Sequence, residues 1–351
     1  MGNTVAPATG ERVTVLEGVP GPIPPAELPI VGEGADARAY HLDLRPRDLA
    51  DFVIIVGDPE RVSTIAERHI VKVQARAEHR GLRTVTGTTA AGTRITVTTS
   101  GMGGASLEIV FNELVALHEI DLATMIPLIP RPAPLTVIRL GTSGALRADT
   151  PLGTAVISAC GVGLDATGLY YDAPGDKQLD EIEKVTYAAI CKTVPPGRYS
   201  QVVPFPYAAR ADPNLVRELE ISAKRLNVIH KLGVTASAGG FFANQGRRPI
   251  ARMRPTVPDV DAALGAVDFA PYGIPWKLEN MEMEAAALFH LGACVEYPCA
   301  AVCLTVAQRV EGTFLPGAAA LMEAAASVVV DAIDRIAAIA NRATTASQVP
   351  K

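Results

Sequence analysis

Apolar stretches that lead into turns alternate with helical patterns along most of this 351-residue chain. The helical pattern is clearest in "ASLEIVFNELVALHEI", residues 105–120. The strand-like stretches occupy residues 52–62, 94–104, 136–146, 232–242 and 299–309. Alternating strands and helices predict an α/β domain built on a central sheet. Ligands of such sheets bind beyond the carboxyl ends of the strands, so a site is expected in the turns that follow them.

The two ends of the chain differ from its body. Residues 1–37 form a proline-rich extension, and residues 344–351 are expected to be a loose tail. Between them we predict a single catalytic domain over residues 38–343. A polar, proline-broken segment at about 172–204 is interpreted as an insertion on that domain.

Composition and charge narrow the class of partner. A formal net charge of -5 and the lack of any Lys/Arg block argue against nucleic acid or an acidic membrane. The apolar stretch near the C-terminus contains Glu323, Asp331 and Asp334, which is typical of a packed helix rather than a membrane span. Five cysteines without a C-x-x-C pair favour a reducing compartment, and the sequence has no metal-ligand spacing. We therefore expect a soluble, cytoplasmic protein without a metal.

Glycines and arginines stand at the ends of the predicted strands. Gly57 and Arg61 follow the first strand, and Arg139, Gly141 and Thr142 lie at the end of the third. Glycine lets backbone N–H groups approach an anion, and arginine adds forked donors suited to phosphate. Each glycine alone also fits a tight turn, and each arginine a solvated surface. Arg139 favours the phosphate interpretation, because an arginine inside the apolar run "TVIRLG" is costly to bury unless an anion meets it.

The glycine pattern also limits the kind of phosphate compound. "SGMGGAS" lacks the third glycine of the dinucleotide fingerprint G-x-G-x-x-G, and the chain contains no P-loop motif. Free phosphate therefore fits the sequence better than a nucleotide such as ATP.

Two carboxylates flank a methionine in "NMEMEAAAL". Glu282 and Glu284 stand just before a helical pattern that begins at about Ala285. Residues two apart share one face of an extended segment but not of a helix, so we place them at a strand end that feeds the helix. A carboxylate there suits the vicinal hydroxyls of a sugar, with Met283 packed on the ring. Glutamates that stabilise a helix dipole fit the same pattern, and the residues alone leave both interpretations open.

Several motifs taken together resemble one family. The set is "GDPERV", "TSGMGGASLEI", "RLGTSGAL", "GVTAS" with "FFANQGR", "NMEMEAAAL" and "LTVAQRVEG". Their order resembles that of the nucleoside phosphorylases over about residues 38–340, and within that family they are most similar to the members that act on uridine. The resemblance implies a single α/β domain with a central mixed, twisted sheet flanked by helices.

The resemblance also implies roles for individual residues. The implied phosphate-binding residues are Gly57, Arg61, Arg80, Arg139 and Thr142. The implied ribose-binding residues are His41, Glu282, Met283 and Glu284. The implied uracil-binding residues are Phe241, Gln245, Arg247 and Arg309. In the family, the counterparts of His41 and Arg80 act across a subunit interface, so we expect a homodimer with shared active sites.

The implied activity is the reversible phosphorolysis of uridine to uracil and ribose 1-phosphate in pyrimidine salvage. Phosphate is then a co-substrate, and no metal or organic cofactor is required. Purine-selective relatives carry an aspartate after the late strand, and "LTVAQRV" has none. A purine nucleoside phosphorylase and a non-catalytic nucleoside-binding protein stay open as alternatives. A hydrolase is disfavoured, because water as the nucleophile needs no cationic site.

Two departures from the family pattern concern the base site and the assembly. Asn244 stands where the family usually has glycine, and Gly239 and Gly240 stand where it has a polar or acidic residue. The turn around the base is therefore expected to differ. The insertion at about 172–204 argues against a hexamer and for a dimer.

Overall fold

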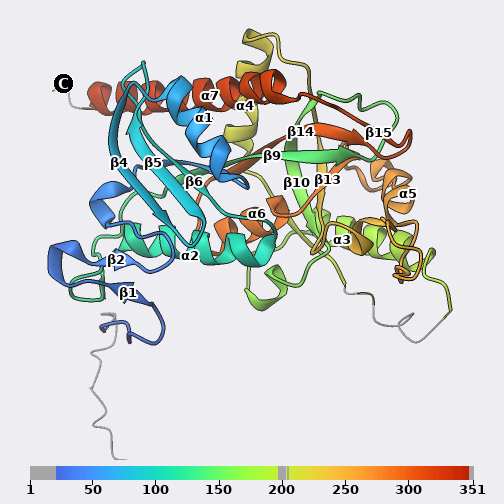
Figure 1. Ribbon diagram of the computed structural model, residues 1–351, viewed down its shortest axis with the longest axis horizontal. Coiled ribbons are helices and arrows are strands. Elements are labelled where there is room, and N and C mark those ends of the chain that lie inside the picture. The colour runs from blue at the N-terminus through green and yellow to red at the C-terminus, as the bar shows by residue number, and fades with distance from the viewer. Residues whose placement is uncertain (1–20, 197–202, 204, 348–351) are drawn as a thin grey trace, which may run out of the picture.

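One large sheet runs through the protein, with helices on both of its faces (Figure 1). The computed structural model describes residues 21–196, 203 and 205–347. Within them, eleven strands form the large sheet. In order across the sheet these are β15 (Thr313–Phe314), β14 (Cys299–Gln308), β10 (Ala155–Gly163), β12 (His230–Ser237), β13 (Leu278–Glu282), β9 (Thr136–Ala145), β3 (Phe52–Val56), β6 (Arg94–Thr99), β5 (Leu82–Thr88) and β4 (Lys72–His79), with β11 (Tyr207–Arg210) paired to β10.

Strand directions in the sheet are mixed, as expected. β3 pairs in parallel with both β6 and β9, whereas β13 pairs antiparallel with β9. β14 pairs with β9 on one side and with β10 on the other. The strands β14, β10, β12, β13 and β9 therefore close into a ring, and β3, β6, β5 and β4 extend from it as an open sheet. The predicted fold class is confirmed.

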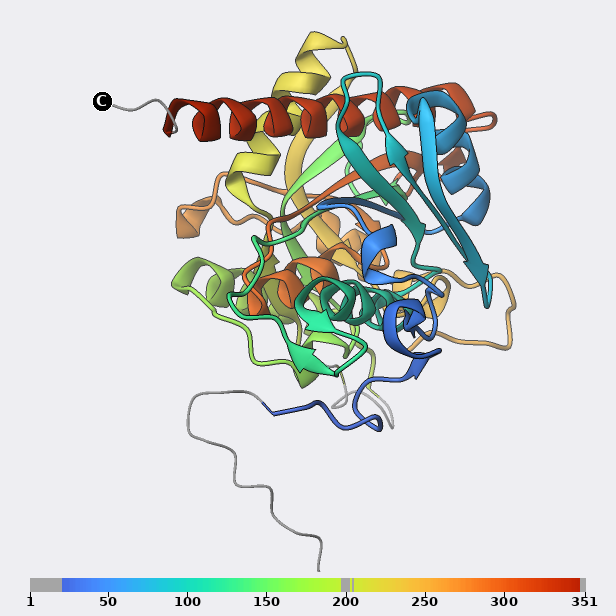
Figure 2. The same ribbon diagram turned by 90° about the vertical axis from the view of Figure 1, so that its left-hand side faces the viewer.

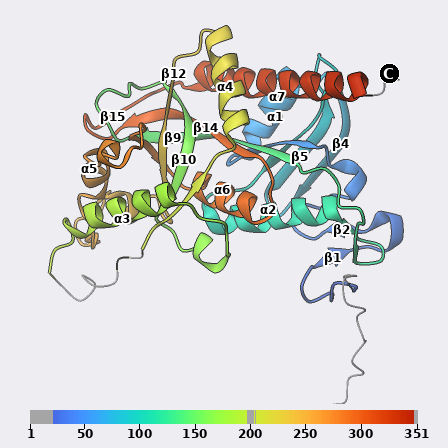
Figure 3. The same ribbon diagram turned by 180° about the vertical axis from the view of Figure 1, so that it is seen from behind.

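The helices form two layers around the sheet. α1 and α7 contact each other, as do α4 and α7, on one side, and α2 contacts α6 on the other (Figures 1 and 3). Figure 2 gives a side view with α7 along one face and α2 on the opposite one. The α-helices are α1 (Pro59–His69), α2 (Gly104–Glu119), α3 (Lys177–Cys191), α4 (Pro213–Arg225), α5 (Val260–Gly265), α6 (Ala285–Cys294) and α7 (Ala319–Ser347).

Short elements complete the chain. The two-stranded pairs are β1 (Ile30–Val31) with β2 (Arg38–Ala39), and β7 (Ile120–Asp121) with β8 (Ile126–Pro127). The 3-10 helices are η1 (Gly34–Asp36), η2 (Pro46–Asp48), η3 (Gly168–Tyr170), η4 (Ala243–Gln245) and η5 (Ala270–Tyr272).

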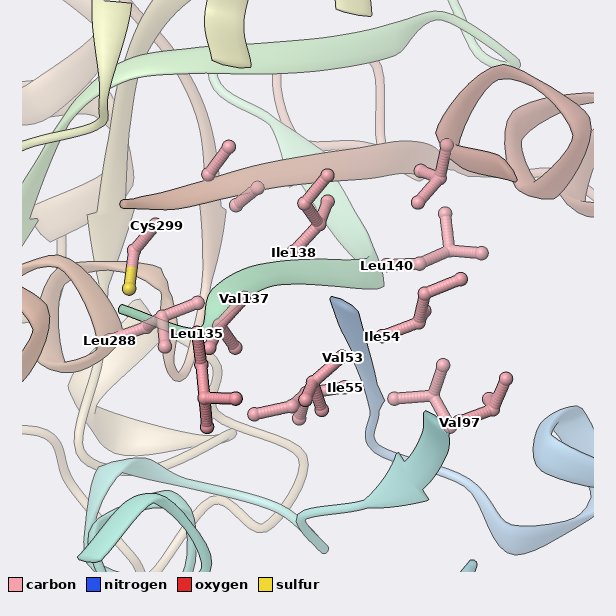
Figure 4. Packing of buried hydrophobic residues seen from close by; sticks show 14 of the residues in the cluster. Val53, Ile54, Ile55, Val97, Leu135, Val137, Ile138, Leu140, Leu288 and Cys299 are labelled. Atoms are coloured by element: carbon pink, nitrogen blue, oxygen red, sulfur yellow. The ribbon is translucent and has the colours of Figure 1, made fainter. Parts of the chain in front are cut away.

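The core lies where β3 and β9 meet the helices (Figure 4). Val53, Ile54 and Ile55 are all buried, because a strand between parallel neighbours with helices on both faces exposes neither side. Ile138 and Leu140 of β9 pack against them. Burying each such side chain contributes about 1.5–3 kcal/mol, so these strand ends are firmly held.

The predicted insertion and the predicted tail are both partly helical in the structure. Part of the predicted insertion, residues 177–191, forms α3, which contacts α5 and β11, while residues 197–202 and 204 lie outside the described residues. α7 continues through residue 347, so only 348–351 of the predicted tail lie beyond it, and these are not described. Within the described residues, no helix is both long and apolar enough to cross a membrane.

Candidate active site

A cavity of about 260 Å³ opens where β3 and β6 end, beside the later half of β9. Its walls come from segments that are far apart in the sequence but adjacent in the sheet. The predicted site residues that line it are Gly57, Arg61, Arg139, Thr142, Phe241, Gln245, Arg247, Glu282, Met283 and Glu284. The position agrees with the rule that ligands bind beyond strand ends.

Arg139 lies at the centre of one end of this cavity and is 4% exposed. Its Nε donates to Glu282 Oε2 at 2.8 Å, and its Nη2 donates to Glu284 Oε2. Nη1 is buried and has no hydrogen-bond partner among the described residues. Burial alone would lower the pKa of Arg139, but the Glu284 and Glu282 carboxylates raise it above its ordinary value. The guanidinium is thus a permanent cation with one nitrogen left for a ligand.

Gly141 is required by this arginine. A Cβ on Gly141 would lie 2.8 Å from Arg139 Nη2, which is closer than real contacts allow. The glycine of "RLGTSG" therefore makes room for the guanidinium rather than serving a turn, because it lies within β9.

Arg61 brings a second positive charge to the same end. It stands in the first turn of α1, whose N-terminus is capped by Asp58 accepting from the backbone N–H of Glu60 at 3.0 Å. Its Nη1 donates to the Leu140 carbonyl at 3.4 Å. Burial lowers the pKa of Arg61, and the nearby Arg139 charge lowers it further. Half-buried Arg61 and buried Arg139 thus bring two guanidinium groups to this end of the cavity, and the forked donors of arginine suit a phosphate.

Both glutamates stand at the junction between β13 and α6, as the sequence predicts. Glu284 accepts from the Gly103 backbone N–H at 2.5 Å, at the N-terminus of α2. Gly103 has a φ of +94°, a conformation that favours glycine. Burial raises the pKa of the Glu284 carboxyl to about 7, with the Glu282 charge adding to the rise and Arg139 opposing it. Glu284 therefore links Arg139 to the N-terminus of α2.

Polar donors line the opposite end of the cavity. Gln245 is 3% exposed, and its Oε1 accepts from Arg309 Nη2. The Arg247 guanidinium carbon lies 4.0 Å from the ring centroid of Phe241. Burial lowers the pKa of Arg309 to about 10, and the Arg247 charge lowers it further. Arg309 itself is not among the described residues that line the cavity; it lies behind Gln245 and against Gly144, where a Cβ would be 2.8 Å from its Nε. This end of the cavity therefore offers the donors of Gln245 and Arg247 beside the Phe241 ring.

His41 and Arg80 do not occur among the described residues that line the cavity. The His41 ring and backbone are held by Glu113 of α2, with Nδ1 2.7 Å from Oε1. Arg80 Nη1 donates to the Tyr40 hydroxyl at 3.4 Å, and the Tyr40 ring meets the His41 ring edge-on at a centroid distance of 4.9 Å. The two predicted site residues thus gather around Tyr40, away from their own cavity.

Sequence reasoning did not identify every residue around the cavity. Met102, Ser143 and Phe314 line it, and Phe314 comes from the two-residue strand β15. A strand this short leaves no periodic signal. Met102 lies within the motif "SGMGG", where the glycines rather than the methionine indicated a ligand site.

A second, larger cavity of about 880 Å³ adjoins the first, and Met102 and Met283 line both. Gly239 and Asn244, which depart from the family pattern, line this second cavity. A Cβ at Gly239 would lie 3.2 Å from Asp165 Cβ, so the glycine lets the chain pass close to Asp165.

Comparison with known proteins assigns the family. A family model described as the phosphorylase superfamily matches residues 51–343. The chain belongs to the phosphorylase superfamily. This match includes all the predicted site residues except His41, which lies just before it.

Two of the three relatives described next are similar over most of the chain, and the third over about a third of it. A uridine phosphorylase of Thermococcus kodakarensis is 30% identical over 291 residues, which cover 82% of this chain and 83% of the relative. A DeoD-type purine nucleoside phosphorylase of Bacillus subtilis is 30% identical over 120 residues, covering 34% and 45%. The crystal structure of a Trypanosoma brucei nucleoside phosphorylase, described as showing uridine phosphorylase activity, superposes with a TM-score of 0.78 at 29% identity, covering 86% and 98%.

Proposed function

We propose that this member of the phosphorylase superfamily is a pentosyltransferase that converts uridine and phosphate reversibly to uracil and ribose 1-phosphate. The observation that carries the proposal is the cavity itself. One end holds Arg139 with an unpartnered buried Nη1, and the other holds the donors Gln245 and Arg247. Glu284 accepts from Arg139 Nη2 and so lies beside the anion end. An anion, a sugar and an acceptor-rich base fit this order.

The chemistry follows from that order. Phosphate at Arg61 and Arg139 attacks C1′ of the ribose, a C1′–O bond forms, and the C1′–N1 bond breaks with its electron pair passing to the base. The base departs as a delocalised anion, which the donors Gln245, Arg247 and Arg309 stabilise. Catalysis then rests on positioning and charge. We propose that the reaction needs no cofactor beyond phosphate, and that it serves pyrimidine salvage in the cytoplasm.

The positions of the acidic residues around the cavity bear on whether the substrate carries a pyrimidine or a purine base. The acidic residues among the described lining of the cavity are Asp58, Glu282 and Glu284. All three are at the anion and sugar end, since Asp58 caps α1 and the two glutamates contact Arg139. A purine leaves more readily when an acid protonates its ring, and the lining at the base end offers Gln245 and Arg247 instead. Asp261 acts on Arg247 and Arg309 but is not among the described lining residues. This favours uracil over a purine.

Substrate selectivity tests that argument. With saturating phosphate, we expect kcat/KM for uridine to exceed that for inosine by about a hundredfold or more, the contribution typical of general acid catalysis that a purine would lack here. Release of uracil and hypoxanthine can be followed by chromatography in parallel reactions. Equal kcat/KM for the two nucleosides would contradict the assignment and favour a purine nucleoside phosphorylase.

We further propose that the protein is a homodimer in which His41 and Arg80 complete the cavity of the neighbouring subunit. Along α2, Ala105, Ile109 and Asn112 form an exposed face, and Glu113, which holds His41, follows it. If two copies pack through this face about a twofold axis near Ile109, their α2 helices run antiparallel. The region of residue 113 in one copy then lies opposite residue 105 in the other. Ala105 lines the larger cavity, beside the nucleoside site.

A further inference from the structure

Glu282 and Glu284 have different hydrogen-bonding capacity left, although both lie at the same junction. A carboxylate offers about four lone-pair positions. Glu282 already accepts from the Ser237 hydroxyl at 2.5 Å, from Arg139 Nε at 2.8 Å, and from the backbone N–H groups of Glu284 and Ala285 at 2.9–3.1 Å. Those donors fill its capacity. A sugar hydroxyl would have to displace one of them.

Glu284 has capacity to spare. Its two donors within the described residues are the Gly103 backbone N–H and Arg139 Nη2. Each occupies one oxygen, so each oxygen keeps a lone-pair position for a hydroxyl. The hydrogen-bonding capacity of Glu282 is therefore filled, whereas Glu284 can still accept hydrogen bonds from a ligand.

We propose that Glu282 is a positioning residue for phosphate rather than a ligand of the sugar. This inference rests on the proposed phosphorolysis. Glu282 and Glu284 together hold the Nε and Nη2 edge of the Arg139 guanidinium. The guanidinium is planar and rigid, so fixing that edge fixes the direction of the unpartnered Nη1. Glu282 thus aims the donor that phosphate uses.

Ser237 in turn holds the Glu282 carboxylate in position. It stands at the end of β12 and is 1% exposed. Its hydroxyl donates to Glu282 Oε1 and accepts from the Ala286 backbone N–H at 2.9 Å. The position of the Glu282 carboxylate is therefore set by β12 and by the first turn of α6 together, and the α6 N-terminus stabilises its negative charge.

The test separates the phosphate and nucleoside sides of the kinetics. In Glu282→Gln the side-chain amide can accept hydrogen bonds only at its oxygen. Its NH₂ group then meets either the backbone N–H groups of α6 or the Arg139 guanidinium, and donor faces donor. The Arg139 guanidinium therefore loses its fixed direction. We expect the KM for phosphate to rise about tenfold or more, as for the loss of a charged hydrogen bond, with the KM for uridine changed less than about twofold. Phosphate binding measured by calorimetry without nucleoside should weaken by the same factor.

Glu279→Gln is the matched control. Glu279 is a buried glutamate on the same strand, and it pairs with Lys231 at 3.2 Å and with Thr150 rather than with Arg139. Its substitution removes an equal charge from β13, so we expect both KM values to stay within about twofold of the parent. Ser237→Ala leaves Glu282 in place, so we expect it to raise the KM for phosphate less than Glu282→Gln does. It replaces Glu282→Gln as the test variant if Glu282→Gln does not fold.

Three outcomes would overturn the inference. One is a rise in the KM for uridine as large as that for phosphate in Glu282→Gln. Another is unchanged phosphate affinity in both Glu282→Gln and Ser237→Ala. A third is a phosphate effect of equal size in Glu279→Gln, which would make the role purely structural. If the parent binds phosphate but cleaves no nucleoside, the proposed reaction fails while the calorimetric comparison still decides the role of Glu282.

Discussion

Replacing Arg139 with methionine is expected to reduce kcat/KM for phosphate by about a hundredfold to a thousandfold. The side chain supplies the unpartnered Nη1 at the anion end, and loss of one such donor in a preorganised site typically has an effect of this size. The change also leaves Glu282 and Glu284 buried with no guanidinium between them. The free energy of unfolding should therefore fall by about 3–5 kcal/mol.

Arg131→Met is the control for Arg139→Met. Arg131 also lies between two glutamates, Glu119 at 2.8 Å and Glu296 at 3.3 Å, but it is exposed and does not line the cavity. We expect its substitution to leave kcat/KM for phosphate unchanged within about twofold. Steady-state kinetics at varied phosphate, together with urea unfolding of each variant, measures both effects. Unchanged phosphate kinetics in Arg139→Met would remove the anion site from this end of the cavity.

Mixing two inactive variants is expected to restore activity if the sites are shared. Arg80→Ala removes a residue proposed to reach the neighbouring cavity, and Glu284→Gln removes one from the protein's own cavity. A heterodimer of the two then has one site with Glu284 and the neighbour's Arg80 intact, and one site with both changes. Purified through two different affinity tags, it should show about half of the parental kcat per dimer, because one of two symmetric sites is whole.

The control for mixing is a heterodimer of two Arg80→Ala subunits that carry the same two tags. It should have the low activity of Arg80→Ala alone. Activity in the mixed heterodimer no higher than in this control would mean that Arg80 acts within its own subunit or not at all. A monomer in sedimentation at working concentrations would contradict the shared site directly.

The sequence predicted much of the framework because its signals are local. The apolar runs 52–62 and 136–146 include β3 and β9, and Gly57 after β3 and Gly144 within β9 both line the cavity. Arg139 was informative for a local reason as well, since a charge inside an apolar run has to meet an opposite charge or a ligand. The structure adds that it meets Glu282 and Glu284 even without a ligand.

The roles of the two glutamates could not be separated from sequence. Arg139 and Glu282 are 143 positions apart, and Ser237 reaches Glu282 across 45. Which carboxylate is saturated depends on the register of β12 and β13, where Ser237 lies opposite Glu282. Contacts of this kind follow from strand pairing, which local patterns do not specify. The helical continuation of α7 to residue 347 was not predicted, because residues 344–347 carry no apolar periodicity of the kind that indicates a packed helix.

The most direct test of the whole account is base release from uridine by the purified protein, with and without added phosphate. The account predicts that uracil appears only when phosphate is present, and that ribose 1-phosphate forms in equal amount. Uracil released at the same rate without phosphate, with free ribose as the second product, would contradict it.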